Sequence, residues 1–413
     1  MKSINFLQRE KNIGWLGLLL GVQHLLAMFG ATTLVPLLTG FSVPVALFAA
    51  GVGTLLFHLV TKGQVPVFLG SSFAFIPAIV LVGSTYGLPY AQGGIMVAGL
   101  LYLIFAAIVY KTGSEKISKI FPPHVVGSMI CIIGITLMPV AFDMAGAKWS
   151  ISLSTLAVGA IISLFAPGFG KQLAIIAAIT FGYLMSMKGG MVDFTPIISA
   201  NLIQTPAFTS PQFNLGAIML IAPIVLATFM EHIGDIAANQ ETVGKNFLKD
   251  PGLHRTLIGD GIATAFAGFI GGPANTTYSE NTGVLALTKN YEPGVLRVAA
   301  WLAIILSFSG KLSAIFASIP IAVIGGVSIM LFGMIAKIGL KTFYTDLLKN
   351  VDPIQKAAKS IIFAIMLYIG MQSGATILGL TFSPMAVAAF VGIILDTIRK
   401  GVLKWISSKE MVQ

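Results

Sequence analysis

Charged residues are scarce in this sequence. Asp, Glu, Lys and Arg make up 10% of the 413 residues, whereas soluble domains carry about 25%. Hydrophobic residues make up 56% of the chain, and its mean hydropathy is +0.91. This composition excludes an ordinary soluble domain and predicts a polytopic protein embedded in a lipid bilayer.

Cysteine and metal-ligand patterns are nearly absent. The single cysteine, Cys131, lies in an apolar run, so it has no partner for an intrachain disulfide. No H-E-x-x-H or similar spacing occurs, which leaves a membrane-embedded hydrolase supported only by the paired carboxylates described below. We therefore expect a protein that is not an enzyme and has no metal or organic cofactor.

Basic residues are unevenly distributed along the chain. The formal net charge is +10, from 25 Lys and Arg against 15 Asp and Glu. With fourteen spans and a cytoplasmic N-terminus, the odd-numbered connections contain only Lys148, Lys188 and Lys311. This asymmetry follows the positive-inside rule, so it indicates topology rather than nucleic acid binding. No cleavable signal pattern is present, and we expect both termini on the cytoplasmic side of an inner membrane.

Fourteen apolar segments are long enough to cross a hydrocarbon core of about 30 Å. They begin near Trp15, Val43, Val67, Gly93, Pro123, Ile151, Gln172, Leu215, Thr256, Thr276, Val295, Leu312, Ala357 and Phe382. Gly, Pro, Ser and Thr shorten or interrupt the third, ninth and tenth segments, so the count can move by one.

The two halves of the chain resemble each other at a separation of 208 residues. Gln23-His24 aligns with Glu231-His232, and Gly70-Ser71-Ser72 aligns with Tyr278-Ser279-Glu280. The matches are few, so chance agreement is the alternative. Seven spans per half is an odd number, which predicts an all-α fold of 7+7 spans in an inverted repeat, as in secondary transporters.

The third and tenth segments are expected to begin extended and to continue as helices. Pro66 and Pro273 disfavour helix in the residues before them, and Gly and Ser lower helix propensity before each apolar run resumes. Two such half-helices would direct unpaired backbone N–H groups at one site. The alternative is a pair of closely packed Gly/Ser-rich helices.

Acidic residues occur inside apolar segments, where a charge is costly and indicates function. Glu231 and Asp235 share one helix face, and Glu280 follows the break in the tenth segment. Their repulsion requires a shared proton, a cation or a ligand donor. Two alternatives are a hydrated Asp235 outside the site and a metal site formed with His232, for which oxygen ligands are too few. His24 is either a proton carrier or a buried hydrogen-bonding residue.

The ligand that suits these groups is a small, planar, neutral ring. Carboxylates accept hydrogen bonds, half-helix N–H groups donate them, and Phe73 and Tyr278 offer flat faces. A nucleobase satisfies all three requirements. Two acids at the site argue against an anion transporter or channel, which remains the alternative from another functional class.

The run Glu280-Asn281-Thr282-Gly283-Val284-Leu285-Ala286-Leu287-Thr288-Lys289 resembles the signature of the nucleobase/ascorbate transporter (nucleobase:cation symporter 2) family. Gln23-His24, Gly70-Ser71-Ser72-Phe73 and the stretch 250–255 agree in order and spacing, so the resemblance covers essentially the whole chain. Glu rather than Gln at position 280 is similar to the bacterial uracil:proton symporters. The resemblance implies proton-coupled uracil import, with xanthine or another base as the alternative substrate.

The resemblance also implies a core domain (1–110 and 190–310), a gate domain (111–189 and 311–413) and a homodimer. It implies substrate contacts at Glu231, Glu280, Phe73, Ser279, Tyr278 and Ser72, proton coupling at Glu231, Asp235 and His24, and gate contacts at Ser328 and Phe332. Three positions depart from its closest pattern, because Asp235, Ser279 and Phe332 replace His, Gly and Tyr.

Overall fold

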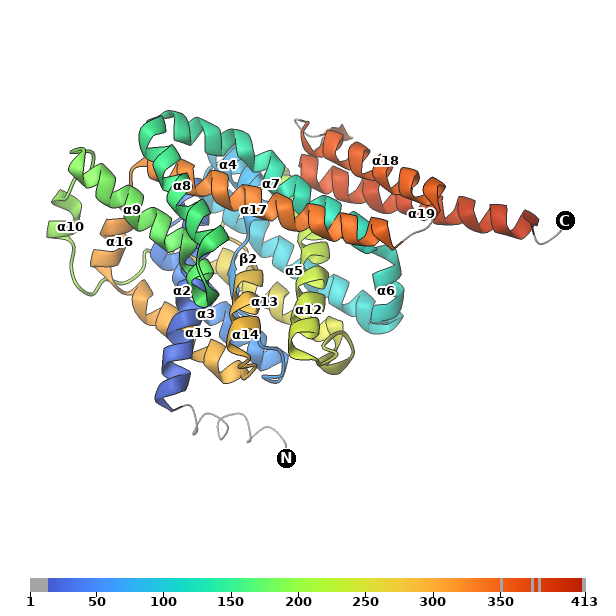
Figure 1. The fold of residues 1–413 in the computed structure, drawn as a ribbon, viewed down its shortest axis with the longest axis horizontal. Coiled ribbons are helices and arrows are strands. Elements are labelled where there is room, and N and C mark those ends of the chain that lie inside the picture. Colours follow the sequence, from blue (N-terminus) through green and yellow to red (C-terminus); the bar gives the residue numbers. More distant parts are fainter. Residues whose placement is uncertain (1–13, 350–351, 373–374, 378–379, 411–413) are drawn as a thin grey trace.

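The computed structural model describes residues 14–349, 352–372, 375–377 and 380–410. The chain is mostly helical (Figure 1). Its α-helices are α2 (Trp15–Thr39), α3 (Val43–Val60), α4 (Ile76–Thr85), α5 (Leu88–Thr112), α6 (Ser114–Ile120), α7 (Pro123–Gly146), α8 (Trp149–Phe165), α9 (Ala174–Lys188), α10 (Thr195–Ser199), α11 (Leu215–Ile221), α12 (Val225–Val243), α13 (Leu253–Ile270), α14 (Ser279–Thr288), α15 (Pro293–Ser307), α16 (Gly310–Ala317), α17 (Ile321–Leu348), α18 (Pro353–Gly370) and α19 (Pro384–Glu410).

Shorter elements join these helices. Short stretches of other helix types are η2 (Phe73–Phe75), η3 (Gly168–Leu173), η4 (Ala222–Ile224) and η5 (Leu248–Gly252). The strands are β1 (Leu69–Ser71), β2 (Asn275–Thr277), β3 (Ala375–Ile377) and β4 (Leu380–Phe382). Within the described residues, seven helical stretches are long and apolar enough to cross a membrane. This agrees with the prediction of a multi-pass membrane protein.

The predicted segments coincide with helices, with two differences at their boundaries. The segment expected from Leu312 is divided into α16 and α17, because Pro320 lacks an N–H and cannot continue a helix from α16. Helix α17 then continues to Leu348, so it extends close to the start of the segment predicted near Ala357. The β3–β4 hairpin was not predicted.

The helices pack in two groups. In the first, here called the α3–α13 group, α3 packs against α13 and α15, α5 packs against α13, α4 and α11, and α2 packs against α15. In the second, the α7–α17 group, α7 packs against α17, α18 and α19, and α8 packs against α17 and α9. Figure 1 shows α7, α17, α18 and α19 side by side. Helix α12 contacts members of both groups.

Glycine allows the closest helix contacts in each group. A Cβ atom at Gly99 of α5 would lie 2.4 Å from the backbone nitrogen of Ala265 on α13. A Cβ atom at Gly339 of α17 would lie 2.2 Å from the backbone nitrogen of Cys131 on α7. Small residues at these crossings bring backbones together, which is how helices commonly associate in a bilayer.

Strands β1 and β2 form a short antiparallel pair that joins the third and tenth segments. Leu69 pairs with Thr277 and Ser71 pairs with Asn275. Neighbouring hydroxyls complete the backbone hydrogen bonding, because the Leu69 N–H donates to Thr54 Oγ1 over 2.9 Å and Thr264 Oγ1 donates to the Asn275 carbonyl over 2.9 Å. These partners permit non-helical backbone among apolar helices. The predicted extended stretches are therefore present, and the alternative of two uninterrupted Gly/Ser-rich helices is wrong.

Candidate functional site

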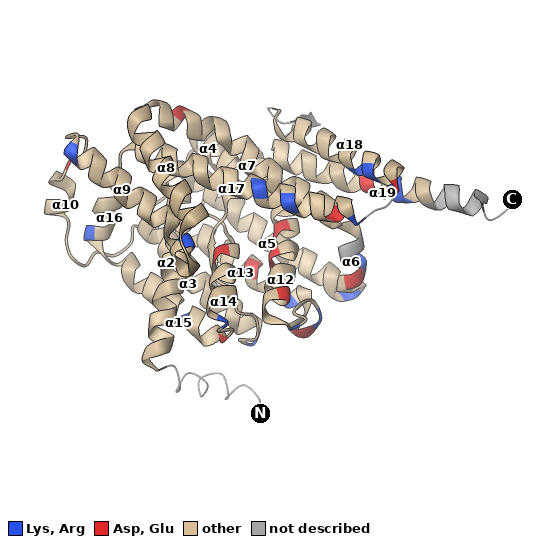
Figure 2. Cartoon of the chain, in the orientation of Figure 1, with Lys and Arg blue, Asp and Glu red and all other residues tan. Residues whose placement is uncertain are grey.

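Glu231 and Glu280 occupy different helices beside the β1–β2 pair. Glu231 lies on α12, and Glu280 lies in the first turn of α14 directly after β2. Figure 2 shows acidic residues on α12, α13 and α14 near the centre of the view. Both side chains are half-buried, and among the described residues Glu231 Oε2 has no hydrogen-bond partner. A buried carboxylate oxygen requires a donor, so Glu231 is available to a ligand or a proton.

Asp235 is held by two hydroxyl groups from the segment that precedes Glu280. Thr277 Oγ1 donates to Asp235 Oδ2 and Ser279 Oγ donates to Asp235 Oδ1, each over 2.7 Å. The carboxylate thus connects α12 to the junction of β2 and α14. Asp235 therefore lies beside the start of the helix that carries Glu280, which is the position that the predicted site requires. Two of the departures noted in the sequence, Asp235 and Ser279, contact each other.

Backbone groups at the two helix starts supply donors near the carboxylates. The first N–H groups of a helix lack partners within that helix, and α14 has no side-chain cap at Tyr278. The turn that begins at Phe73 likewise has no side-chain cap at the residue before it, Ser72. The Ser72 backbone N–H donates to the Ala274 carbonyl over 2.8 Å, while its buried hydroxyl has no partner among the described residues.

The two aromatic residues singled out by the sequence have different surroundings. The Tyr278 hydroxyl donates to the Ser71 carbonyl over 2.9 Å, and the side chain is 4% exposed. Its ring covers Gly70, where a Cβ atom would lie 2.4 Å from Tyr278 Cζ. The hydroxyl of Tyr278 is therefore occupied by β1, and the glycine at position 70 makes room for the ring.

Phe73 and Phe332 bring the predicted gate segment to the site. Their ring centroids are 6.2 Å apart, and the planes meet at 76°, an edge-to-face contact. Phe332 is fully buried, and Ser328 lies one helical turn earlier on α17 with a buried hydroxyl. The two predicted gate residues thus lie on a helix that reaches Phe73.

His24 connects α2 with α14. The side-chain nitrogen Nδ2 of Asn281 donates to the His24 carbonyl over 2.9 Å and lies 3.2 Å from His24 Nδ1. With Asn281 as the donor, His24 Nδ1 accepts. This contact agrees with the hydrogen-bonding interpretation of His24 and fixes its orientation beside the helix that carries Glu280.

Sequence reasoning missed a contact between a buried histidine and a buried acid. His232 Nδ1 lies 2.9 Å from Asp260 Oδ2, and His232 Nε2 lies 2.9 Å from Thr256 Oγ1. All three side chains are fully buried. Asp260 is an acid within a Gly- and Thr-rich apolar segment, and that signal was available in the sequence.

The metal site considered from Glu231, His232 and Asp235 does not form in the described part of the chain. Both ring nitrogens of His232 face Asp260 and Thr256, and Asp235 is bonded to hydroxyls. No group of three or more potential ligands lies together among the described residues. The site therefore consists of carboxylates, hydroxyls and backbone donors.

Comparison with known proteins agrees with this arrangement. A family model described as "Permease family", for xanthine and uracil permeases, matches residues 17–379. The chain therefore belongs to this family of nucleobase/ascorbate transporters, which confirms the resemblance seen in the sequence and identifies a permease rather than an enzyme.

Several relatives in this family match nearly the whole chain. It is 41% identical to a probable uracil permease of Haemophilus influenzae, over 92% of this chain and 93% of the relative. It is 40% identical to a uracil permease of Bacillus subtilis, over 96% and 95% of the two chains. A uracil permease of Escherichia coli is 38% identical, over 92% and 90%.

The fold is shared with more distant transporters. The transmembrane domain of the cyanobacterial bicarbonate transporter BicA superposes with a TM-score of 0.62 at 15% identity, over 93% of this chain and 97% of that domain. Murine Slc26a9, an anion transporter in the inward-facing state, gives 0.66 at 11% identity, over 98% of this chain and 71% of that protein. At these identities the likeness concerns the fold alone.

Proposed function

We propose that the protein imports uracil together with protons across the inner membrane. The observation that carries this proposal is the Glu231 carboxylate, of which one oxygen has no partner among the described residues; it lies on α12, which packs against α14, the helix that starts without a side-chain cap and carries Glu280. Relatives that cover nearly the whole chain are uracil permeases. Xanthine or another nucleobase is the alternative substrate.

Recognition follows from the hydrogen-bonding pattern of the ring. Uracil carries N–H donors and carbonyl acceptors on one plane. Glu231 and Glu280 accept from the N–H groups, and the backbone N–H groups at Phe73 and Ser279 donate to the carbonyl oxygens. Phe73 covers one face of the uracil ring. Ser72 and Tyr278 hold the two extended segments that precede α4 and α14. A site that pairs every polar group of one base rejects bases with a different pattern.

Proton coupling is assigned to Glu231 rather than Asp235. Both oxygens of Asp235 already accept hydroxyl hydrogen bonds, whereas Glu231 has an oxygen without a donor. A proton on Glu231 removes one negative charge from a site that contains Asp235 and Glu280 as well. Protonation of Glu231 thus favours the site with uracil bound, and loss of this proton on the cytoplasmic side favours release of uracil. His24 orients Asn281 in this scheme.

The membrane architecture proposed with this function is a fourteen-span inverted repeat with both termini in the cytoplasm. The β1–α4 and β2–α14 units are corresponding breaks joined by strand pairing. The α3–α13 group falls within the proposed core, residues 1–110 and 190–310, and the α7–α17 group falls within the proposed gate, residues 111–189 and 311–413. Transport proceeds by movement of the core domain against the gate domain within each subunit of a homodimer.

The test is uptake of labelled uracil by proteoliposomes, with and without an inward proton gradient. We expect accumulation that requires the gradient and disappears in Glu280→Ala, while Glu292→Ala, at an exposed glutamate before α15, behaves as the unsubstituted protein. Uptake that is indifferent to Glu280 contradicts the site. Competition by unlabelled xanthine that exceeds competition by uracil contradicts the substrate.

An anion substrate is the alternative from another functional class, because an anion transporter can share this fold. The two half-buried glutamates at the site oppose an anion. Bicarbonate or sulfate uptake by the same proteoliposomes, without uracil uptake, would favour that alternative.

A further inference from the structure

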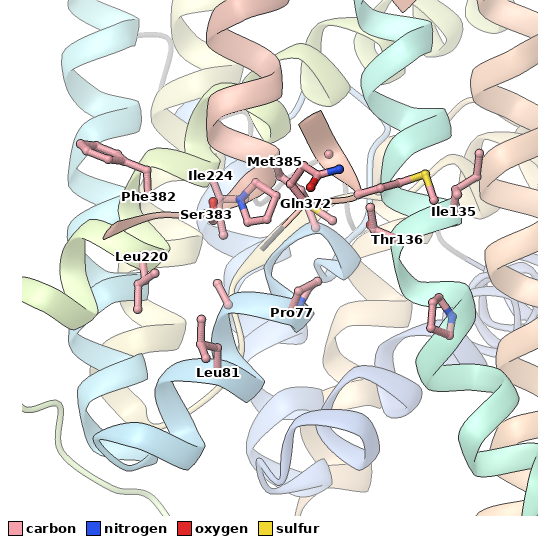
Figure 3. A pocket seen from close by; sticks show the side chains of 16 residues that line it. Pro77, Leu81, Ile135, Thr136, Leu220, Ile224, Gln372, Phe382, Ser383 and Met385 are labelled. Carbon is pink, nitrogen blue, oxygen red and sulfur yellow. The ribbon is translucent and has the colours of Figure 1, made fainter. Parts of the chain in front are cut away.

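A separate cavity of about 270 Å³ lies where the two helix groups meet. Figure 3 shows its walls: Pro77 and Leu81 come from α4, Ile135 and Thr136 from α7, and Met385 from α19. The cavity is therefore bounded by both the α3–α13 group and the α7–α17 group.

The cavity extends from an exposed mouth to a buried floor. At the mouth, Leu81 is 46% exposed and Met371 is 62% exposed. At the floor, Ala74, Ala78 and Met385 are at most 3% exposed. Ala74 follows Phe73 directly in the chain. The floor therefore lies next to the edge-to-face contact between Phe73 and Phe332, on a different set of side chains from the carboxylate site.

The polar side chains of the wall are engaged within the protein. Thr136 Oγ1 donates to the Ile132 carbonyl on its own helix over 2.9 Å. Gln372 Nε2 donates to the Tyr368 carbonyl over 3.3 Å, and Ser383 Oγ accepts from the Ala386 N–H over 3.3 Å. Most of the wall is apolar, so a polar ring such as uracil would find few hydrogen-bond partners here, which is unfavourable. An apolar molecule loses no hydrogen bond on entry.

We propose that this cavity binds a compact, uncharged, apolar molecule about the size of an aromatic ring, and that its occupant inhibits transport. Apolar cavities of about 150 Å³ lined by aliphatic and aromatic side chains hold benzene, so this volume is sufficient. The inhibitory half rests on the proposed function. An occupant that contacts both helix groups stabilises the arrangement in which the cavity exists, and so opposes movement of one group against the other.

Binding is tested with fluorobenzene as the probe and fluorine NMR of the purified, full-length protein as the readout. The Ala78→Phe variant places a ring inside the cavity. Val80→Phe is the matched control, because Val80 is on the same helix but 44% exposed and absent from the cavity lining. We expect a saturable change of the fluorobenzene signal with the unsubstituted protein and Val80→Phe, and its loss with Ala78→Phe. An equal response of both variants overturns the site.

A second measurement does not depend on how Ala78→Phe packs. Leu81→Cys places a thiol at the mouth, while the native Cys131 is fully buried. We expect saturating fluorobenzene to slow maleimide labelling of Leu81→Cys. Labelling that is unchanged by the probe contradicts binding at this cavity.

The inhibitory effect is measured separately by uracil uptake into proteoliposomes. We expect fluorobenzene to lower the maximal rate without raising KM in the unsubstituted protein and in Val80→Phe, with loss of this effect in Ala78→Phe. Uptake that stays unaffected at saturating probe overturns inhibition. Absence of uracil uptake by the unsubstituted protein overturns the proposed function alone, because probe binding is read without transport.

Discussion

Acidic residues have different partners in two polar clusters of the molecule. One is the site cluster around Glu231, and the second lies in the α7–α17 group around His124. At the site, Asp235 accepts from the hydroxyls of Thr277 and Ser279, and Glu231 keeps an oxygen without a partner. Among the described residues, no Lys or Arg forms an ion pair with the carboxylates of this cluster. In the part of the chain that the structure describes, the donors to Asp235 are thus neutral hydroxyls.

In the second cluster, His124 of α7 lies between two aspartates. His124 Nδ1 is 3.0 Å from Asp346 Oδ2 on α17, and His124 Nε2 is 2.9 Å from Asp396 Oδ1 on α19. Both nitrogens donate only when the imidazole carries two protons. Cations complete the cluster: Lys359 pairs with Asp346 over 2.6 Å, and Arg399 with Asp396 over 2.7 Å.

The difference separates a structural role from a functional one. Opposite charges at the His124 cluster stabilise one another and join α7, α17, α18 and α19. Within the described ranges of the chain, the acids around Glu231 have no neighbouring cation to stabilise their charge. They can therefore exchange a proton or accept a hydrogen bond from a ligand. Substitutions should therefore affect stability at the His124 cluster and transport at the Glu231 cluster.

The largest expected effect on stability follows removal of a buried acid from the His124 cluster. Asp396→Ala leaves His124 and Arg399 without their shared acceptor, and breaking a buried charge pair costs about 3–5 kcal/mol. Thermal unfolding in detergent should show a clearly lower Tm. Asp143→Ala, at an exposed aspartate on α7, is the control. Equal unfolding of the two variants would contradict a structural role for the cluster.

The largest expected effect on transport follows neutralisation of Glu231. Glu231→Gln keeps an oxygen acceptor and resembles the protonated, loaded form, but it no longer exchanges a proton. Uracil binding should therefore weaken by no more than the contribution of one neutral hydrogen bond, about 0.5–1.5 kcal/mol or at most about tenfold. Accumulation should no longer respond to external pH, because the proton carrier is gone, whereas Tm should be unchanged. Glu241→Gln, exposed on the same helix, serves as the control. Gradient-driven uptake with unchanged pH dependence would show that Glu231 does not carry the proton.

A smaller effect is expected at the hydroxyls that hold Asp235. Ser279→Ala removes one hydrogen bond, which we expect to weaken uracil binding by about 1 kcal/mol. A double-mutant cycle with Asp235→Asn should give a coupling energy of similar size, since the two side chains are in direct contact. Thr242→Ala, whose hydroxyl bonds to its own helix, is the control. Strict additivity of Ser279→Ala and Asp235→Asn would rule out the coupling.

The smallest effect is expected at the contact between the two helix groups. Edge-to-face aromatic pairs contribute about 0.5–1.5 kcal/mol beyond burial, so a cycle of Phe73→Leu and Phe332→Leu should show coupling at the lower end of that range. Urea or thermal unfolding measures the stability term. Zero coupling would mean that Phe332 contacts Phe73 without stabilising the arrangement.

Local patterns in the sequence predicted the helical fold and much of the site. Pro66 and Pro273 indicated the two breaks, because proline affects backbone conformation within one or two residues. Glu231, Asp235 and Glu280 were found because a charge among apolar residues is visible in any short window. Asp260 is also a charge among apolar residues, but it was not predicted as a site residue. Its segment is rich in Gly and Thr, and these residues indicated an interrupted helix.

Local sequence patterns did not predict which residues form hydrogen bonds with each other. Asp235 and Ser279 are 44 residues apart, and the sequence presented them as unrelated departures from a family pattern. His232 meets Asp260 over 28 residues, and His124 meets Asp396 over 272. Such contacts depend on helix crossings, which are set by the summed packing of many side chains.

The sequence by itself determined that this chain is a helical, multi-pass membrane protein with the acids Glu231, Asp235 and Glu280 inside apolar segments, because hydrophobicity, charge and proline act locally. Only the tertiary structure decided which acids are held and which are available. Strand pairing of β1 with β2 brings Thr277 and Ser279 to Asp235 and leaves Glu231 unpartnered. The meeting of the two helix groups likewise creates an apolar cavity that no single segment encodes.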